Sequence, residues 1–187
     1  MEDWEKVKQI TKQYINVLHE QLGWFNEEEL HNTPRRITDF YKELHNNHKY
    51  QFTLFPAVKD SMIVINNVEM YSLCAHHMLP FFGKVSIAYL PKNDGKIAGV
   101  SKLARAVVKM ASQPQTQEYL SQQIIDELVK NLQPHFVLVK IQAQHMCMMM
   151  RGVKQQESIV TTTSLYVSNE MKSELATLKQ EAMELMS

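Results

Sequence analysis

Apolar residues recur about every three to four positions near both ends of the chain, which is the spacing of an amphipathic helix. Residues 3–22 show this spacing, with charged residues between the apolar ones (Trp4, Val7, Ile10, Tyr14, Val17 and Leu18). Thr33-Pro34 is typical of a helix start, with threonine as N-cap and proline in the first turn. A last amphipathic helix is predicted over 170–186, and the polar residues 45–60 indicate a connecting loop.

From Ser61 onward apolar residues alternate with polar or smaller ones, which is the pattern of a half-buried strand. The alternation involves two groups of residues (Ile63 and Ile65, then Val85, Ile87 and Tyr89). Asn93-Asp94-Gly95 marks a turn, and strand character returns at 136–150 and 159–167. The sequence therefore predicts two pairs of strands.

Two helices are predicted between the strand pairs. The first is capped by Ser101 and runs to about Ala111, and the second runs from near Gln115 to Leu132. Segregated helix pairs and strand pairs favour the α+β class with an antiparallel sheet. We expect a single domain over 1–187, with a helical part at 1–60 and the catalytic core with its C-terminal helix at 61–187.

Composition narrows the class of protein. The chain has 187 residues, 44% of them hydrophobic, which is enough to bury a core. Twenty basic residues balance twenty acidic ones, so the net charge indicates neither nucleic acid nor an anionic membrane as a partner. The charged N-terminus lacks the apolar region of a signal peptide, and no apolar run is long enough to span a membrane. We expect a soluble, cytoplasmic protein.

The two cysteines of the chain each lie within three positions of a histidine, in Cys74-Ala75-His76-His77 and in His145-Met146-Cys147. Cysteine and histidine are the ligands that zinc prefers, and thiolates argue against magnesium or calcium. Two cysteines and one histidine would leave a fourth position open, as in a catalytic zinc site, and a further histidine in each segment for proton transfer. Two alternatives remain: plain buried thiols, or a disulfide, which a reducing cytoplasm disfavours.

The spacing within each segment predicts local geometry. If residues 145–151 are extended, His145, Cys147 and Arg151 share one face, and the other face carries Met146, Met148 and Met150. The alternative is a buried methionine-rich strand with an incidental histidine. Cys74 and His77 would point to opposite faces of a regular strand, so a turn must intervene, and only one of the paired histidines can face the metal.

Two further places could bind a ligand. Gly99–Arg105 opens a predicted helix, where free N–H groups attract anions, and Lys102 and Arg105 are neighbours on one helix face. The alternative is an ordinary solvated basic face. Glu118, near the start of the next helix, could accept paired N–H donors such as those of a guanine edge, although the helix dipole alone favours a carboxylate there.

Together these segments resemble the GTP cyclohydrolase I family, and the resemblance covers about residues 30–167. The stretches that carry it are Asn32–Arg36, Ser72–Phe81, Gly83–Val85, Gly99–Arg105, Gln115–Glu118 and His145–Gly152. The resemblance implies a T-fold subunit whose sheets join around a five-fold axis, two such rings forming a homodecamer with active sites between subunits.

The resemblance also implies the role of each site residue. Zinc ligands would be Cys74, His77 and Cys147, with His76 and His145 as acid and base. Gln117 counts among the catalytic residues at a substrate-holding position, together with Ser101 and, on the guanine edge, Glu118. The triphosphate contacts would be Lys102, Arg105 and Arg151, with Arg36 reaching in from a neighbouring subunit.

The reaction implied by this resemblance is hydrolysis of GTP. Water activated by zinc adds to C8 of the purine, formate is released, and the ribose rearranges to give 7,8-dihydroneopterin triphosphate. Ala75 departs from the family, which usually has glutamate there, and Gln113 stands where a basic residue is common. Two alternatives remain: a zinc- or nucleotide-binding relative without catalysis, and another T-fold enzyme such as a nitrile reductase, which uses a nucleophilic cysteine.

Overall fold

The computed structural model describes residues 3–46, 50–58 and 61–187. The chain divides into two compact units, Met1–Asn47 and His48–Ser187. Each unit is described by itself, and the expectation of a single domain over 1–187 stays a prediction. Part of the predicted loop at 45–60, namely 47–49 and 59–60, lies outside the described residues.

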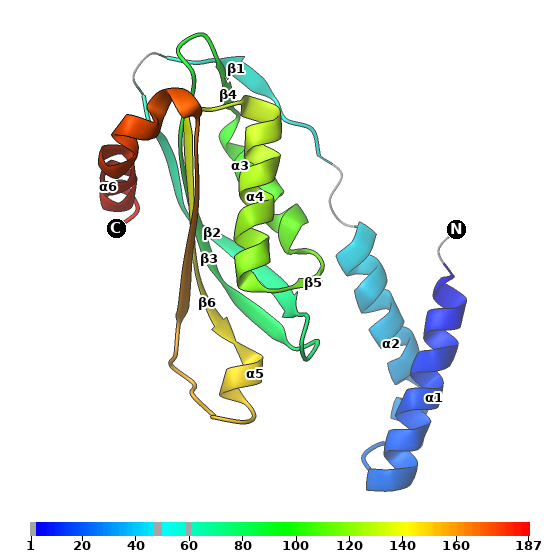
Figure 1. Cartoon of the computed structure of the whole chain (residues 1–187). Coiled ribbons are helices and arrows are strands. Elements are labelled where there is room, and N and C mark those ends of the chain that lie inside the picture. Colours follow the sequence, from blue (N-terminus) through cyan, green and yellow to red (C-terminus); the bar gives the residue numbers. More distant parts are fainter. Residues whose placement is uncertain (1–2, 47–49, 59–60) are drawn as a thin grey trace. The chain divides into compact units, whose positions relative to one another are not determined.

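The first unit contains two helices (Figure 1). Helix α1, Trp4–Leu22, confirms the first prediction. Its N-cap Asp3 accepts a hydrogen bond from the backbone N–H of Lys6 at 3.0 Å. It ends at Gly23, which has a φ of 66° in the left-handed region that glycine adopts without strain.

Helix α2, Glu27–Asn46, begins earlier than Thr33-Pro34, so that predicted start is wrong. The N-terminus is instead a capping box: the N–H of Glu29 donates to the Asn26 side chain at 3.0 Å, and the N–H of Asn26 donates to the Glu29 carboxylate at 2.9 Å. Acidic residues in this first turn also interact favourably with the positive end of the helix dipole.

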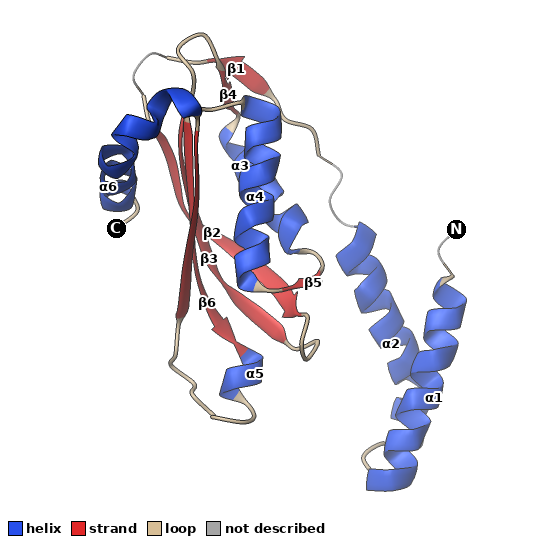
Figure 2. Ribbon diagram, viewed as in Figure 1, coloured by secondary structure: helices blue, strands red, loops and turns tan. Residues whose placement is uncertain are grey.

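The second unit is built on a twisted five-stranded sheet with the strand order β5-β2-β3-β6-β7 (Figure 2). The long strands are β2 (Ile63–Cys74), β3 (Pro80–Leu90), β6 (Phe136–His145) and β7 (Val160–Val167). Their pairing is antiparallel, whereas the short edge strand β5 (Pro114–Gln115) runs parallel to β2. The α+β class and the antiparallel sheet are confirmed, and the short parallel pair at this edge was not predicted.

A second, two-stranded sheet joins β1 (Leu54–Pro56) and β4 (Lys96–Ala98). Strand β1 lies within the residues predicted to be a loop, so that prediction is wrong for this part. Strands of three residues are too short to show an alternating pattern.

Helices cover both faces of the large sheet (Figure 1). The main core lies between the sheet and α3 (Val100–Ala111) and α4 (Gln117–Leu132). On the other face, α6 (Leu175–Leu185) packs over Ala88, Phe136 and Leu138, after a short 3-10 helix at Asn169–Glu174. The predicted cap at Ser101 is wrong, since Gly99 is the N-cap of α3 and Ser101 lies inside the helix.

The predicted strand over 136–150 stops at His145, and Met146–Met149 forms one helical turn, α5. The ladder with β3 ends at the pair Phe81–His145, and the ladder with β7 ends earlier, at Ala143. Residues beyond His145 therefore have no strand to pair with, and methionine favours helix. The shared strand face predicted for His145, Cys147 and Arg151 is wrong.

Within the described ranges, the helices lack the combination of length and hydrophobicity that crossing a bilayer requires.

Candidate active site

The hairpin between β2 and β3 places Cys74 and His77 together. Cys74 is the last residue of β2, and its carbonyl oxygen accepts the backbone N–H of His77 at 3.2 Å and that of Met78 at 2.8 Å. Met78 takes a left-handed φ of 55°, which completes the turn before β3. The predicted turn between Cys74 and His77 is confirmed, and it directs the imidazole back toward the thiol.

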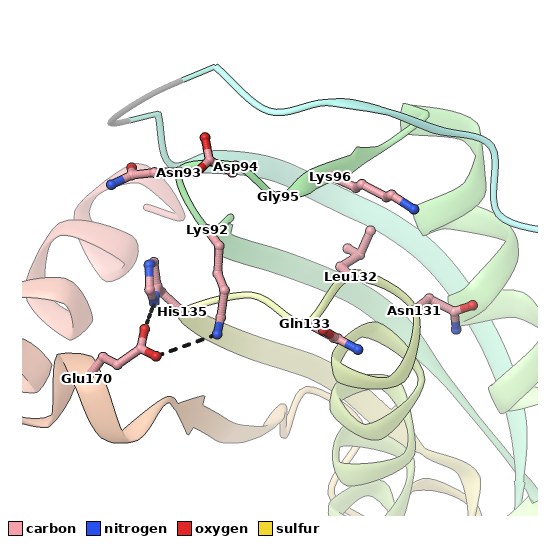
Figure 3. A pocket seen from close by; sticks show the side chains of 10 residues that line it. All are labelled: Lys92, Asn93, Asp94, Gly95, Lys96, Asn131, Leu132, Gln133, His135 and Glu170. Atoms are coloured by element: carbon pink, nitrogen blue, oxygen red, sulfur yellow. Dashed lines mark ion pairs between the residues drawn. The ribbon is translucent and has the colours of Figure 1, made fainter.

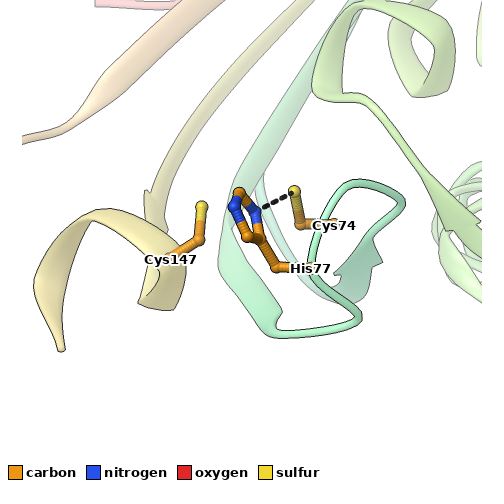
Figure 4. Close-up of side chains that lie close together, drawn as sticks. All are labelled: Cys74, His77 and Cys147. Carbon is orange, nitrogen blue, oxygen red and sulfur yellow. Dashed lines mark hydrogen bonds between the residues drawn. The ribbon is translucent and has the colours of Figure 1, made fainter. Parts of the chain in front are cut away.

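Helix α5 brings Cys147 to the same place (Figure 4). Cys74, His77 and Cys147 each offer one ligand atom, and these three atoms lie within 4.8 Å of one another. These three residues are called the metal group below. The Cys74 sulfur lies 3.9 Å from Nδ1 of His77, and both cysteines are free thiols. In a tetrahedral zinc site such atoms are roughly 3.6–3.8 Å apart, so small side-chain shifts would suffice for binding.

Burial differs among the three donors, and the difference suits a catalytic metal. Cys74 is buried, Cys147 is half-buried and His77 is exposed, so the group opens to solvent on the histidine side. Burial raises the pKa of the Cys147 thiol, and the neighbouring Cys74 raises it further. A bound cation would reverse this effect, because it stabilises the thiolate form.

His76 lies at the rim of the group and is exposed. Its Nδ1 is 3.8 Å from the Cys74 sulfur, and its ring is almost perpendicular to that of His77, at 84°. The backbone N–H of Ala75, between the cysteine and His76, donates to the Gln115 carbonyl at 3.2 Å, which ties the turn to β5. His76 thus lies beside one of the three candidate metal ligands.

His145 occupies the end of β6 in a defined environment. Its ring stacks on the cross-strand residue Phe81 with centroids 4.7 Å apart and planes 4° from parallel. Its Nε2 lies 2.8 Å from the side-chain oxygen of Gln117, the first residue of α4. Burial lowers the pKa of His145, and the carboxylate of Glu118 opposes this shift. The ring is therefore mainly neutral near pH 7 and can accept a proton.

Arg151 also reaches this end of the sheet. Its Nη1 lies 3.4 Å from Nε2 of His77, so a fixed positive charge stands beside the metal group. This cation reaches the site from the residues after α5, and not from the strand face that the sequence pattern indicated.

The other residues predicted to hold the substrate belong to other elements of the chain. Ser101, Lys102 and Arg105 are in the first half of α3, whereas its last residue, Ala111, leads into β5 beside Cys74. At a rise of about 1.5 Å per residue they lie roughly 9 to 15 Å before the end of that helix. Arg36 belongs to the first unit, where its Nη2 lies 2.9 Å from the Glu28 carboxylate.

A cavity of about 500 Å³ lies near the C-terminal end of α4, whereas Gln117 begins that helix (Figure 3). In this cavity the Glu170 carboxylate lies 3.7 Å from the Lys92 ammonium and 3.4 Å from the His135 ring. The negative charge of Glu170 is therefore balanced by the positive charge of Lys92. A helix of this length separates the cavity from Gln117 by about 22 Å. The cavity is therefore not part of the metal group.

The sequence analysis did not single out two residues that support the predicted catalytic side chains His145 and Gln117. Phe81 lies under His145, and the hydroxyl of Thr162 lies 3.1 Å from the side-chain nitrogen of Gln117. The run Thr161-Thr162-Thr163 held a signal, because successive strand residues alternate faces and the middle one must point opposite to its neighbours.

Comparisons with known proteins agree with this geometry. Residues 8–187 match the family model described as GTP cyclohydrolase I. A protein of Sulfurihydrogenibium sp. named GTP cyclohydrolase 1 is 40% identical over 165 residues, covering 87% of this chain and 86% of that protein. A protein of the same name from Streptococcus pyogenes is 41% identical over 189 residues, covering 98% of this chain and 93% of that protein.

A solved structure of the archaeosine synthase QueF-Like in the apo form aligns with a TM-score of 0.46 at 13% identity, covering 59% of this chain and 98% of that one. A similarity of this size is too small to support a conclusion. The match to the family model and the identity to the two relatives extend over nearly the whole chain. The chain belongs to the GTP cyclohydrolase I family.

Proposed function

We propose that this protein is a zinc-dependent GTP cyclohydrolase I that opens the purine ring at C8, releases formate and forms 7,8-dihydroneopterin triphosphate. The observation that carries the proposal is the convergence of Cys74, His77 and Cys147 in a chain of this family. Two sulfurs and one imidazole suit zinc and leave a fourth position open.

Zinc held by these three residues would act as a Lewis acid that makes water nucleophilic near neutral pH. The chain's own residues then manage the protons. Addition of water across the C8–N bond requires a base for the water proton and an acid for the ring nitrogen. His76, whose Nδ1 lies 3.8 Å from the Cys74 sulfur, and His145, two residues before Cys147, can fill these roles.

Substrate binding falls to the charged residues. Glu118 is exposed in the first turn of α4 and would accept the paired N–H donors of the guanine edge. Ser101, Lys102, Arg105, Arg151 and Arg36 would hold the triphosphate. The phosphates are not cleaved, so these groups orient the nucleotide and carry no bond-breaking role.

We infer that the working enzyme is a homo-oligomer, a T-fold decamer of two rings, with each site completed by a neighbouring subunit. The support is the position of these residues in the second unit: Lys102 and Arg105 lie in the first half of α3, whereas its last residue, Ala111, leads into β5 beside Cys74. A neighbouring subunit that presents its α3 to the metal group would supply the missing phosphate contacts.

Subunit mixing tests this composite site. We expect Lys102→Ala and Cys147→Ser each to be inactive alone, and their co-expressed mixture to recover about a quarter of wild-type turnover, because random assembly pairs two intact halves at roughly one site in four. Activity is measured as formate release per subunit from GTP. The matched control is a mixture of Lys102→Ala with Arg105→Ala, which share one half and should recover nothing. No recovery in the first mixture would place both halves in one subunit.

The reaction itself is tested by incubating the purified protein with GTP before and after chelation and after restoring zinc. We expect formate and, after oxidation, neopterin fluorescence in equal amounts, lost to less than about 1% on chelation and restored by zinc. Zinc-loaded protein that binds GTP without product would instead be a relative that lacks catalysis. Ala75→Glu would then be the first variant to make, since Ala75 is exposed and its side chain is outside the metal group.

A further inference from the structure

The side chain of Gln117 is almost fully buried, and its hydrogen-bond partners determine which way its amide oxygen and nitrogen point. The residue is 2% exposed. Its amide nitrogen lies 3.2 Å from the Ile141 carbonyl oxygen, 3.0 Å from that of Val160 and 3.1 Å from the Thr162 hydroxyl. Backbone carbonyls can only accept hydrogen bonds, so the nitrogen must face them. The amide oxygen must then face His145.

This orientation determines which nitrogen of His145 carries hydrogen. An amide oxygen can only accept, so the 2.8 Å contact requires a hydrogen on Nε2 of the imidazole. Phe81 lies parallel beneath the ring and prevents it from tilting. Among the described residues Nδ1 of His145 has no hydrogen-bond partner, which leaves that nitrogen available to the reaction.

The same contacts argue against a direct role for Gln117 in holding substrate. Its two amide hydrogens are shared among three protein acceptors, and its oxygen is occupied by His145. The adjacent Glu118 differs, because it is exposed. Two consecutive residues at the start of α4 therefore face different partners: Gln117 faces the protein interior and Glu118 faces the solvent.

We propose that Gln117, held by Thr162 and assisted by Phe81, is a positioning residue that keeps His145 in its Nε2-protonated orientation with Nδ1 free for proton exchange, and that it does not contact the substrate. This inference rests on the proposed function for its kinetic consequences. It replaces the substrate-holding role that family resemblance implied for Gln117 with an effect exerted through His145.

The kinetic test is Gln117→Met, which keeps the length of the side chain and removes its hydrogen bonds. We expect kcat for GTP to fall about 10- to 100-fold, the size of effect seen when a supporting hydrogen bond to a functional group is lost. KM should stay within about twofold and zinc content should be unchanged, because Gln117 touches neither the substrate nor the metal ligands and its loss impairs only proton transfer by His145. Glu118→Gln is the comparison and should raise KM. A large rise in KM for Gln117→Met with kcat intact would overturn the proposal.

Thr162→Val supplies a milder variant in case Gln117→Met does not fold. It keeps the shape of the side chain and removes one acceptor of the Gln117 amide, so we expect a fall in kcat of about three- to tenfold with KM unchanged. The matched control is Thr163→Val, the adjacent exposed threonine on the opposite face of β7, which should behave as wild type. Equal effects of the two variants would contradict the assignment of Thr162.

Two readouts separate positioning from a structural role. In a double-mutant cycle, Gln117→Met should change kcat by less than about twofold in a His145→Ala background, because both act through one group. Independently of activity, solid-state NMR of ¹⁵N-histidine should show Nε2-protonated His145 in the wild type and a tautomer mixture in Gln117→Met. Additive kinetics or an unchanged tautomer would refute the inference. If the wild type forms no product from GTP, the proposed function fails and the tautomer alone decides.

Discussion

Cys147→Ser is expected to abolish zinc retention and to lower GTP turnover by at least about 100-fold. Cys147 supplies one of two sulfurs in a group of three ligand atoms, and a serine hydroxyl stays protonated near neutral pH and binds zinc weakly. Loss of an outer-shell partner alone costs roughly 10- to 100-fold in affinity or activity, so loss of a direct ligand should cost at least as much. The measurements are zinc per subunit after dialysis and formate release from GTP.

Met150→Leu is the matched control for this prediction. Met150 is the C-cap residue of α5, is 58% exposed and lies outside the metal group, so its replacement should leave zinc content and turnover unchanged. Cys147→Ser protein with one zinc per subunit and full turnover would refute the ligand assignment. Loss of zinc in both variants would mean that α5 as a whole, and not the thiolate, holds the metal.

His145→Ala is expected to keep zinc and to lower kcat by about 10²- to 10⁴-fold, the usual contribution of a positioned acid or base. The ring is held by Gln117 and Phe81 and is not one of the three candidate metal ligands, so its removal takes away a proton-transfer group and no ligand. Zinc content tests whether the metal is kept, and single-turnover formate release tests whether the chemical step is slowed. GTP binding, measured separately, shows whether the substrate still enters the site.

His135→Asn is the control, because His135 directly precedes the other end of β6 and pairs with Glu170 and Ser168. Ten steps along the strand separate the two histidines by about 34 Å, so turnover should be retained. If His145→Ala lost its zinc, the histidine would belong to the metal ligands. If it kept full turnover, proton transfer would have to be assigned to His76 alone.

Local pattern and local chemistry explain which elements could be predicted. The helix α1 is long enough to show a period of about 3.6 and was predicted within one residue of its observed bounds, and the alternating residues at 63–65 and 85–89 lie in the long strands β2 and β3. The start of α2 was misplaced because Pro34 is a strong local signal, whereas the capping box at Asn26 and Glu29 is made by a few polar atoms. The strands β1 and β5 exist only through their pairing partners.

The candidate site divides in the same way. Residue type alone was enough to assign Cys74 and Cys147 to one predicted site, since two thiols with nearby histidines suit zinc. The geometry proposed for His145, Cys147 and Arg151 was wrong, because the strand ends where the β3 ladder ends at Phe81. A pattern of alternate residues contains no information on where a partner strand stops.

The sequence by itself determined the class of fold, the metal-binding residue types and the family to which the chain belongs, because these depend on residue identity and spacing. Only the tertiary structure decided that Gln117 faces the interior and that Lys102 and Arg105 lie in the first half of α3, whose last residue leads into β5 beside Cys74. Buried amide orientation follows from which carbonyls surround it, here those of Ile141 and Val160 from two neighbouring strands. Such contacts join residues far apart in the chain, and no local period of the sequence records them.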